Sequence, residues 1–381
     1  MYQKYYGHFL KAHSKTLHLA AHSHHFWPDV TREAQLQYWD DSCQFADDKW
    51  GHFFSTAIPT AQKNIAGLLN ISNSNQIVFA TNTHEFVMRL FSCFEIEKKQ
   101  ITVLTTDSEF YSFERQAQRL GETGQVEIQK VAVEPFATFA DRFAEAAQKL
   151  HPDMIFLSHV FFNSGWVCPL DRIIPLLPAQ SLKVVDAYHS FMALPVDWSA
   201  YEKNIFYLSG SYKYAQGGEG CCFLYVPPNN NLRPAYTGWF AELSHLNAKD
   251  SRIHYPEDGL QFAGSTMDFS ALYRLNAVFK LFRSEGLTLE KQHLYIQDMQ
   301  KYFLTLAEKS NLLVSVKDKL IHQGWDQQGH FLTYELTSVD ATQNLVQTLK
   351  KNGIWTDSRK NRIRFGFGLY VTKADLEKFI S

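Results

Sequence analysis

The residue with the clearest chemical potential is Lys213, which lies between two apolar runs. The run at 205–208 precedes it, and the run at 221–226 follows it after a glycine-rich turn at 217–220. Because burial disfavours the charged form of lysine, this residue type seldom lies between two core strands. A lysine in such a place is typical of enzymes whose amine forms a Schiff base. The alternative is a hairpin lysine whose side chain extends to solvent.

Other polar residues follow the expected strands at the points where those strands end. Asp186 and His189 follow one apolar run, and Thr83 and His84 follow another, where a helix begins. Ligands bind at the carboxyl ends of the strands in an open parallel sheet, so an acid, an imidazole and an amine could meet there. A helix start with hydroxyl and free N–H groups is a natural phosphate site. The alternatives are a capping aspartate and a hydrogen-bonded core histidine.

Together these groups are the parts needed to hold a phosphorylated pyridine aldehyde. Lys213 would supply the amine for an imine, and Asp186 a carboxylate that keeps the ring nitrogen protonated. The helix start would receive the phosphate, and an aromatic side chain would cover the ring. Phe110, which follows the apolar run at 101–105, is the candidate for that cover.

Seven short apolar runs are the elements that must position these residues. The runs are 76–80, 101–105, 126–131, 153–158, 182–186, 204–208 and 220–226. Apolar runs of this length indicate strands buried on both faces. Amphipathic stretches at 86–95, 112–120 and 139–150 indicate helices between them. The alternation predicts an α/β fold with a mostly parallel seven-stranded sheet flanked by helices.

The chain divides into three expected parts. Residues 1–30 form an N-terminal arm, residues 31–284 a large α/β domain, and residues 285–381 a small C-terminal α+β domain. Further helices are expected over 30–69, 267–282, 288–309, 340–351 and 372–379, and further strands near 312–316, 331–336 and 362–367.

The composition argues against several kinds of partner. Apolar residues make up 45% of the 381 residues, and the formal net charge is −2 with acids and bases interspersed. This charge favours neither a nucleic acid nor an anionic membrane as partner. No run reaches the ~18 apolar residues of a membrane span, and the first residues lack the apolar stretch of a signal peptide. We therefore expect a cytoplasmic protein whose five cysteines stay reduced.

The N-terminal arm carries a dense histidine cluster, formed by His18, His22, His24 and His25. Such a cluster invites a metal interpretation, but it has no HExxH spacing, no cysteine partner and no nearby pair of carboxylates. We expect no metal here. An arm that packs on the body of the protein and contributes a polar group to a pocket is the better interpretation.

The lysine segment resembles a known family. Tyr212-Lys213, followed by the glycine turn, is similar to the pattern of the kynureninases, which belong to the fold-type-I, class V group of pyridoxal-phosphate enzymes. Asp186-Ala-Tyr-His189 is similar to the Asp-x-x-His of the same group. The resemblance covers most of the chain and is strongest over 76–240. It implies the fold-type-I transferase fold with pyridoxal 5′-phosphate as cofactor.

The resemblance also implies roles for individual residues. Lys213 would hold the cofactor as a Schiff base and move the α-proton of the substrate, and Asp186 would pair with the pyridinium nitrogen. His189 would lie by the phenolic oxygen of the ring or by the substrate. Tyr212 would bind the phosphate and act as an acid or base.

Four more cofactor residues follow from the same resemblance. Thr83 and His84 would bind the phosphate, and Phe110 would stack on the ring. Trp239 and Thr266 resemble residues that approach the site of the neighbouring subunit, which implies a homodimer with shared active sites.

The C-terminal segment resembles the one whose arginine binds the substrate carboxylate, because a guanidinium makes a planar, bidentate pair with that group. Arg364 aligns best, but Arg362 would face the same side of the strand, so both are candidates. The alternative is a surface arginine at a strand edge.

The activity implied is hydrolytic Cβ–Cγ cleavage of an amino acid, as in kynureninases. An aminotransferase with the same cofactor is the alternative. A desulfurase is disfavoured, since it needs a cysteine on a C-terminal loop and none occurs after Cys222. A catalytically idle binding or regulatory protein is the alternative from another class. The segments expected to select the substrate, after Trp239 and in the N-terminal arm, depart from the kynureninase pattern.

Overall fold

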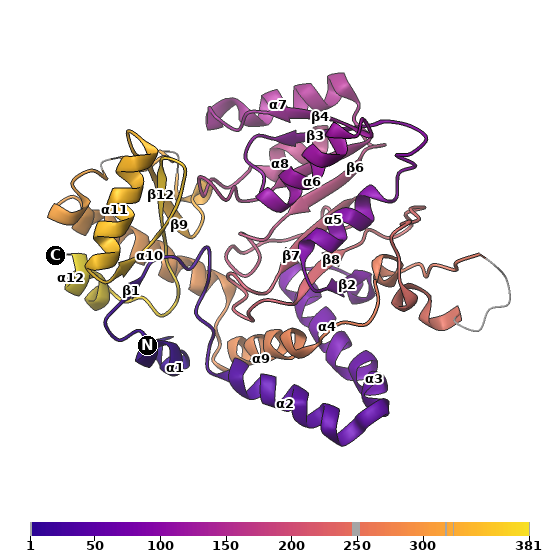
Figure 1. The fold of residues 1–381 in the computed structure, drawn as a ribbon, viewed down its shortest axis with the longest axis horizontal. Coiled ribbons are helices and arrows are strands. Elements are labelled where there is room, and N and C mark those ends of the chain that lie inside the picture. Colours follow the sequence, from indigo (N-terminus) through magenta and orange to yellow (C-terminus); the bar gives the residue numbers. More distant parts are fainter. Residues whose placement is uncertain (1, 246–251, 317, 323, 381) are drawn as a thin grey trace.

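The computed structural model describes residues 2–245, 252–316, 318–322 and 324–380 (Figure 1). Its largest sheet has seven strands in the order β2-β8-β7-β6-β5-β3-β4. The strands are β2 (Ile77–Ala80), β3 (Ile101–Thr106), β4 (Val126–Val131), β5 (Met154–Ser158), β6 (Leu182–Asp186), β7 (Ile205–Gly210) and β8 (Cys222–Tyr225). Neighbours pair in parallel except β8, which is antiparallel to β2 and β7. The predicted α/β fold with a mostly parallel sheet is confirmed.

One detail of the sheet prediction is wrong, because β4 is not buried on both faces. The strands β2, β5, β7 and β8 are buried along their whole length, whereas β4 exposes Glu127 and Lys130. β4 lies at the end of the sheet and pairs only with β3. Charged side chains on an edge strand oppose pairing with another chain, so the polar residues of this run mark its position at the edge.

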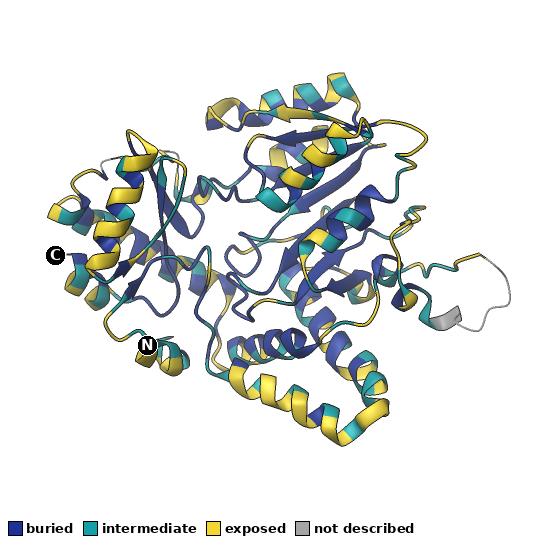
Figure 2. Ribbon diagram, in the orientation of Figure 1, coloured by how far each residue is buried: buried dark blue, intermediate teal, exposed yellow. Residues whose placement is uncertain are grey.

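Helices connect the successive strands. α5 (Thr83–Phe91) follows β2, α6 (Tyr111–Glu122) follows β3, and α7 (Phe136–Leu150) follows β4. Each buries an apolar stripe, such as Phe139 and Phe143 of α7. Figure 2 shows the inner strands of the sheet in the colour of buried residues and the outer faces of these helices as exposed. Because β2 and β3 end where α5 and α6 begin, the connecting loops lie at the carboxyl edge of the sheet.

The helical segment expected over 30–69 is a series of helices rather than one. It contains α2 (Val30–Phe45), α3 (Lys49–His52), a π-helical segment at Phe53–Ala57 and α4 (Ile58–Leu69). The break after α2 occurs at Ala46, whose φ of 45° is incompatible with a right-handed helix. α2 and α4 both pack against α9 (Ser270–Ser284) below the sheet in Figure 1.

The C-terminal part contains a separate three-stranded antiparallel sheet in the order β11-β12-β9. Its elements are α10 (Leu289–Ala307), β9 (Phe331–Glu335), α11 (Val339–Lys351), β11 (Asp357–Arg359), β12 (Arg362–Gly366) and α12 (Lys373–Ile380). The strand expected near 312–316 is wrong: Asn311–Leu313 is a 3₁₀ helix. Leu313 and Val316 are buried and Val314 is exposed, a spacing of three that suits a helical turn rather than a strand.

The N-terminal arm is fixed to this C-terminal part. Its α1 (Gly7–Ala12) leads into β1 (Leu17–His18), which pairs in parallel with β10 (Ile354–Trp355). Figure 1 shows the arm beside the C-terminal elements and far from the outer strand β4. Domain boundaries at 31 and 285 stay predictions. None of the described helices is long and apolar enough to cross a membrane.

Candidate active site

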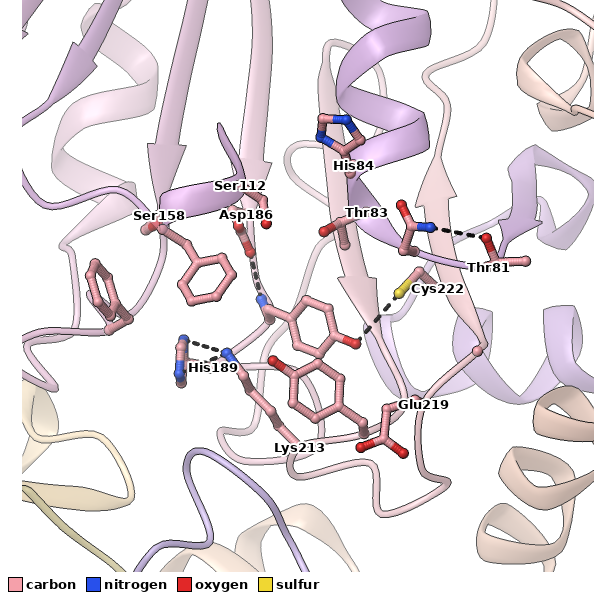
Figure 3. A pocket seen from close by; sticks show the side chains of 16 residues that line it. Thr81, Thr83, His84, Ser112, Ser158, Asp186, His189, Lys213, Glu219 and Cys222 are labelled. Atoms are coloured by element: carbon pink, nitrogen blue, oxygen red, sulfur yellow. Dashed lines mark hydrogen bonds between the residues drawn. The ribbon is translucent and has the colours of Figure 1, made fainter. Parts of the chain in front are cut away.

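A cavity of about 400 Å³ opens at the carboxyl edge of the large sheet (Figure 3). Seven residues predicted from the sequence line it: Thr83, His84, Phe110, Asp186, His189, Tyr212 and Lys213. They come from the ends of β2, β3, β6 and β7 and the loops that follow, which is where ligands bind in parallel sheets. The structure thus brings together residues that are up to 130 positions apart between Thr83 and Lys213.

Lys213 lies at the centre of this group and is 4% exposed. Its Nζ is 2.9 Å from Nε2 of His189. Burial lowers the pKa of Lys213 to about 7, against the opposing charge of Asp186. The amine is therefore partly uncharged at neutral pH, the form that attacks a carbonyl carbon. Its Nζ also lies 5.2 Å from the ring centre of Phe110, the aromatic residue predicted to cover a planar ligand.

Asp186 and His189 line the same cavity as the amine. Asp186 is the last residue of β6, and one carboxylate oxygen accepts the Tyr188 N–H at 2.9 Å. Burial raises the pKa of Asp186, while this hydrogen bond and the charge of Lys213 lower it. Burial and the charge of Lys213 hold the pKa of His189 well below its usual value, so its imidazole is neutral. A neutral imidazole can accept a hydrogen bond from the amine.

The opposite side of the cavity is the first turn of α5. Asn82 is the N-cap, and its side chain accepts the Glu85 N–H at 3.0 Å. Thr83 and His84 follow as the first helical residues, and Figure 3 shows them across the cavity from Lys213. The positive end of the helix dipole and the threonine hydroxyl make this turn suitable for an anion.

The loop that carries Lys213 is held by Arg274 of α9. Its Nε donates to the carbonyl of Gly217 at 2.7 Å, and its Nη2 donates to the carbonyl of Glu219 at 2.6 Å. Gly218 has a φ of 71°, and the indole of Trp27 lies where a Cβ would be, so only glycine fits there. The glycine turn read from the sequence therefore has a steric reason.

Tyr188 is a cavity residue that the sequence prediction missed. Its hydroxyl lies 3.4 Å from Sγ of Cys222, and the Nζ of Lys213 is 4.8 Å from its ring centre. A Cβ on Gly210 would overlap this hydroxyl, so the glycine at the end of β7 makes room for the ring. The position of Tyr188 inside the Asp-x-x-His segment, directly before His189, was the sequence signal from which it could have been predicted. Other lining residues that were missed are Thr81, Asn82, Ser112, Ser158, Phe162, Glu219, Gly220 and Cys222.

The two candidate carboxylate-binding arginines do not line the cavity. Arg364 is 1% exposed, and its Nε donates to Asp357 at 2.8 Å. Arg362 donates to Glu134 at 2.6 Å and to Glu335 at 2.9 Å. Both arginines thus have carboxylate partners within the chain, so a substrate carboxylate would have to compete for either.

Trp239 and Thr266, predicted for a shared site, also lie outside the cavity lining. The indole Nε1 of Trp239 donates to Oγ1 of Thr266 at 3.3 Å, and the tryptophan is 39% exposed. The structure therefore brings these two residues to each other and not to Lys213 of the same chain.

The histidines of the arm find separate partners. His18 shares a hydrogen bond of 2.8 Å with Tyr370, and His25 one of 2.6 Å with the carbonyl of Phe26. His22 stacks on Phe331 with ring centres 4.6 Å apart. Across the described ranges, no group of three or more histidine, cysteine or acidic side chains could hold a metal ion.

Comparison with known proteins identifies a protein family that matches this chain. The model of the aminotransferase class-V family matches residues 20–379. A comparison with curated proteins finds no match.

Solved structures with the same fold include several at low identity. A variant of C-DES with glycine linked to its PLP cofactor shares 18% identity with a TM-score of 0.81, and the match covers 97% of both chains. A cystine C–S lyase complex of C-DES with cysteine persulfide gives the same values. An apo cysteine desulfurase from Thermococcus onnurineus NA1 shares 14% identity with a TM-score of 0.78, over 96% of this chain and 93% of that one. These likenesses show the fold.

Proposed function

Because the chain belongs to the aminotransferase class-V family, we propose that it is an enzyme that acts on an α-amino acid at the cavity around Lys213. Its cofactor is pyridoxal 5′-phosphate. The buried amine of Lys213, with its pKa lowered to about 7, is the observation that carries the proposal. Burial of an amine costs free energy, and a lysine with only a structural role does not require that cost.

The residues of the cavity fit this cofactor. Lys213 supplies a buried nucleophilic amine, and Asp186 supplies a carboxylate at the neighbouring strand end. The first turn of α5, with Thr83 and His84, supplies an anion site on the opposite side. Phe110 and Tyr188 provide aromatic surfaces, each with its ring centre near the Lys213 amine. The cavity of about 400 Å³ is large enough for a small ligand of this kind.

The roles of the residues follow from this arrangement. The bound cofactor supplies an electron-withdrawing ring that stabilises negative charge at the α-carbon of the substrate. Lys213 accepts the α-proton as an amine, and His189, 2.9 Å away, holds the amine in place and takes up its hydrogen bond. Asp186 would pair with the ring nitrogen of the cofactor and favour its protonated form. Tyr212 lines the same cavity and can return a proton.

Hydrolytic Cβ–Cγ cleavage is the reaction we propose, as in the kynureninases that the lysine segment resembles. Water adds to the carbonyl carbon of the substrate side chain, the Cβ–Cγ bond breaks, and the side chain leaves as a carboxylic acid. The electron pair of the broken bond stays on Cβ, which gains a proton, so the second product is alanine. Tyr212, next to Lys213 in the sequence and in the same cavity, supports this reaction by offering a second proton-transfer group.

Cleavage of a C–S bond is the second candidate, because the solved structures with this fold include a cystine C–S lyase. A desulfurase that carries sulfur on a cysteine is not supported. The chain has no cysteine after Cys222, and burial raises the pKa of Cys222 itself to about 12. A thiol with such a pKa is a poor nucleophile. Aminotransfer, which gives the family its name, is the remaining alternative within the same cofactor class.

A homodimer with shared sites is part of the proposal. Trp239 and Thr266 contact each other at the surface, away from the cavity of their own chain. Further exposed large side chains include Trp39 and Tyr236, which are 67% and 60% exposed. Exposed aromatic residues are enriched in protein interfaces. Sedimentation of the purified protein tests this part, and a monomer at micromolar concentration would contradict it.

A panel of amino acids that includes kynurenine, 3-hydroxykynurenine and cystine tests the reaction. Alanine as product supports Cβ–Cγ hydrolysis, pyruvate with ammonia supports C–S lyase activity, and a 2-oxo acid formed from the substrate supports aminotransfer. The Lys213→Ala variant is the control. The wild type should show an imine absorbance near ~420 nm that the variant lacks. Protein without this absorbance, or a variant that keeps it, would refute the cofactor assignment.

A further inference from the structure

The side of the cavity formed by the first turn of α5 holds no lysine or arginine among the described lining residues. The single lysine of the lining, Lys213, lies across the cavity from Thr83 and His84 (Figure 3). A phosphate that enters a buried site needs hydrogen-bond donors in place of its water. The turn supplies backbone N–H groups and the hydroxyl of Thr83. Neutral donors on the other walls of the cavity are therefore of interest.

Tyr188 carries such a donor. Its backbone N–H bonds to Asp186 at the end of β6, at 2.9 Å, which fixes the base of the side chain. Its ring lies 4.9 Å from the ring of Tyr212, centre to centre. Burial raises the pKa of the Tyr188 hydroxyl well above its usual value. The hydroxyl therefore keeps its proton at neutral pH and can donate it in a hydrogen bond.

The hydroxyl of Tyr188 lies next to the first turn of α5. Its oxygen is 3.4 Å from Sγ of Cys222, and Cys222 pairs with Ala80, the last residue of β2 before that turn. Burial raises the pKa of the Cys222 thiol to about 12, against hydrogen bonds from the Tyr188 hydroxyl and from the backbone of Thr83. The thiol thus lies between the tyrosine hydroxyl and the helix turn that suits an anion.

The contact with Cys222 is weak, so the hydroxyl can change its partner. Sulfur is a poor hydrogen-bond acceptor, and a thiol with a pKa of about 12 is uncharged at neutral pH. A phosphate oxygen carries negative charge and accepts a stronger hydrogen bond. The change would leave only the thiol without its tyrosine partner. A buried cysteine tolerates this, because it behaves as a small apolar side chain.

Gly210, the last residue of β7, makes room for the hydroxyl on one side. A Cβ there would overlap both the hydroxyl of Tyr188 and the sulfur of Cys222. Gly210 and Cys222 are paired residues of the neighbouring strands β7 and β8. The backbone of β7 therefore closes one side of the hydroxyl, and the cavity, which Tyr188 lines, is its open side.

We propose that the Tyr188 hydroxyl leaves Cys222 and donates a hydrogen bond to the phosphate of the cofactor at the first turn of α5. The inference rests on the proposed function, because it adds a binding residue to the cofactor site of that same cavity. The ring of Tyr188 stays beside the amine of Lys213, with its centre 4.8 Å from Nζ. One side chain then contributes an aromatic surface near the reacting amine and a donor at the anion site.

Tyr188→Phe removes the hydroxyl and keeps the ring. The dissociation constant of pyridoxal 5′-phosphate should rise about 10- to 100-fold, because a hydrogen bond to a charged group is lost. The constant of pyridoxal, which lacks the phosphate, should stay the same. Quenching of tryptophan fluorescence measures both constants. Tyr207→Phe is the matched control, because Tyr207 of β7 is buried and outside the described lining of the cavity, and it should change neither constant.

Cys222→Ala distinguishes a phosphate contact from a packing role of the hydroxyl. The ratio of the two dissociation constants should stay as in the wild type, because the phosphate does not need the thiol. The same ratio should change in Tyr188→Phe. An unchanged ratio in Tyr188→Phe, or an equal change of the ratio in Cys222→Ala, would overturn the proposal.

Inorganic phosphate tests the same contact in the cofactor-free protein. It should raise the melting temperature of the wild type more than that of Tyr188→Phe, and chloride at the same ionic strength should not distinguish the two. If the wild type binds neither pyridoxal 5′-phosphate nor pyridoxal, the proposed function fails, and the phosphate measurement still decides the role of Tyr188. If both ligands bind and phosphate stabilises Tyr188→Phe as much as the wild type, the role of the hydroxyl alone is refuted.

Discussion

Replacing Glu109 by glutamine should remove a pH-dependent loss of stability. Glu109 precedes Phe110 and is 3% exposed. Its carboxyl oxygens accept the hydroxyls of Thr106 at 2.7 Å and of Ser158, a cavity residue, at 2.5 Å. Burial raises its pKa from 4.5 to about 7, against the hydrogen bonds from Ser158 and Thr106. No cation in the described structure forms an ion pair with this group.

The sign and size of the effect follow from proton linkage. Between pH 4.5 and about 7, the unfolded chain has released the proton of Glu109 while the folded protein keeps it. The free energy of unfolding therefore falls as the pH rises through this window, by about 1.4 kcal/mol per pH unit at most. The full cost, about 3 kcal/mol, is present above pH 7 and absent below pH 4.5. Glutamine has no proton to release, so the variant lacks this decline.

Urea denaturation of the cofactor-free protein at a series of pH values measures the difference. Between pH 5 and pH 8, the free energy of unfolding of Glu109→Gln should gain about 2 to 3 kcal/mol relative to the wild type. Glu145→Gln controls for the loss of one negative charge, because Glu145 is exposed on α7. Parallel curves for the wild type and Glu109→Gln would refute the reasoning. A difference that shrinks as the pH rises would refute it as well.

Three other outcomes are expected. Gly210→Ala places a methyl group against the Tyr188 hydroxyl. Urea denaturation should therefore show that the free energy of unfolding falls by about 1 to 3 kcal/mol. An unchanged midpoint would contradict the position of Tyr188 in that space. In Arg274→Lys the shorter set of donors cannot bind the carbonyls of Gly217 and Glu219 together, so the free energy of unfolding should fall by about 2 kcal/mol. Imine formation by Lys213 should also be slower in this variant. The rate of imine formation by Lys213 should rise as the pH passes through about 7, and a midpoint near the ordinary lysine value of 10.5 would contradict the burial of the amine.

The sequence was sufficient to predict the elements whose structure depends on residues that are close together in the chain. The seven strands were predictable because each is a short apolar run bounded by polar residues. Asp186 and Lys213 could be assigned to one edge because each follows such a strand, and parallel strands end on the same side. The exception at β4 was also in the sequence, since Glu127 and Lys130 interrupt its apolar pattern.

The parts of the site that could not be predicted depend on contacts between segments that are distant in the sequence. The prediction that Arg364 binds a substrate carboxylate stays a prediction, and the carboxylate that it contacts in the structure, Asp357, follows from the cross-strand register of β11 and β12. Ser23 reaches the same carboxylate only because β1 pairs with β10, a contact between opposite ends of the chain. Tyr188 fills the space above Gly210 for steric reasons that appear only in three dimensions. No periodicity or spacing encodes such pairings.

The pairing of β1 with β10 has a consequence for the order of synthesis. All seven strands of the large sheet lie between residues 77 and 225, so that sheet can assemble while the ribosome is still translating the rest. The segment Leu17–His18 emerges first, yet its partner Ile354–Trp355 is made near the end. The arm must therefore wait without its strand partner through most of translation. Docking of the earliest residues is then a late step of maturation, and Asp357 accepts the hydroxyl of Ser23 only when the chain is nearly complete.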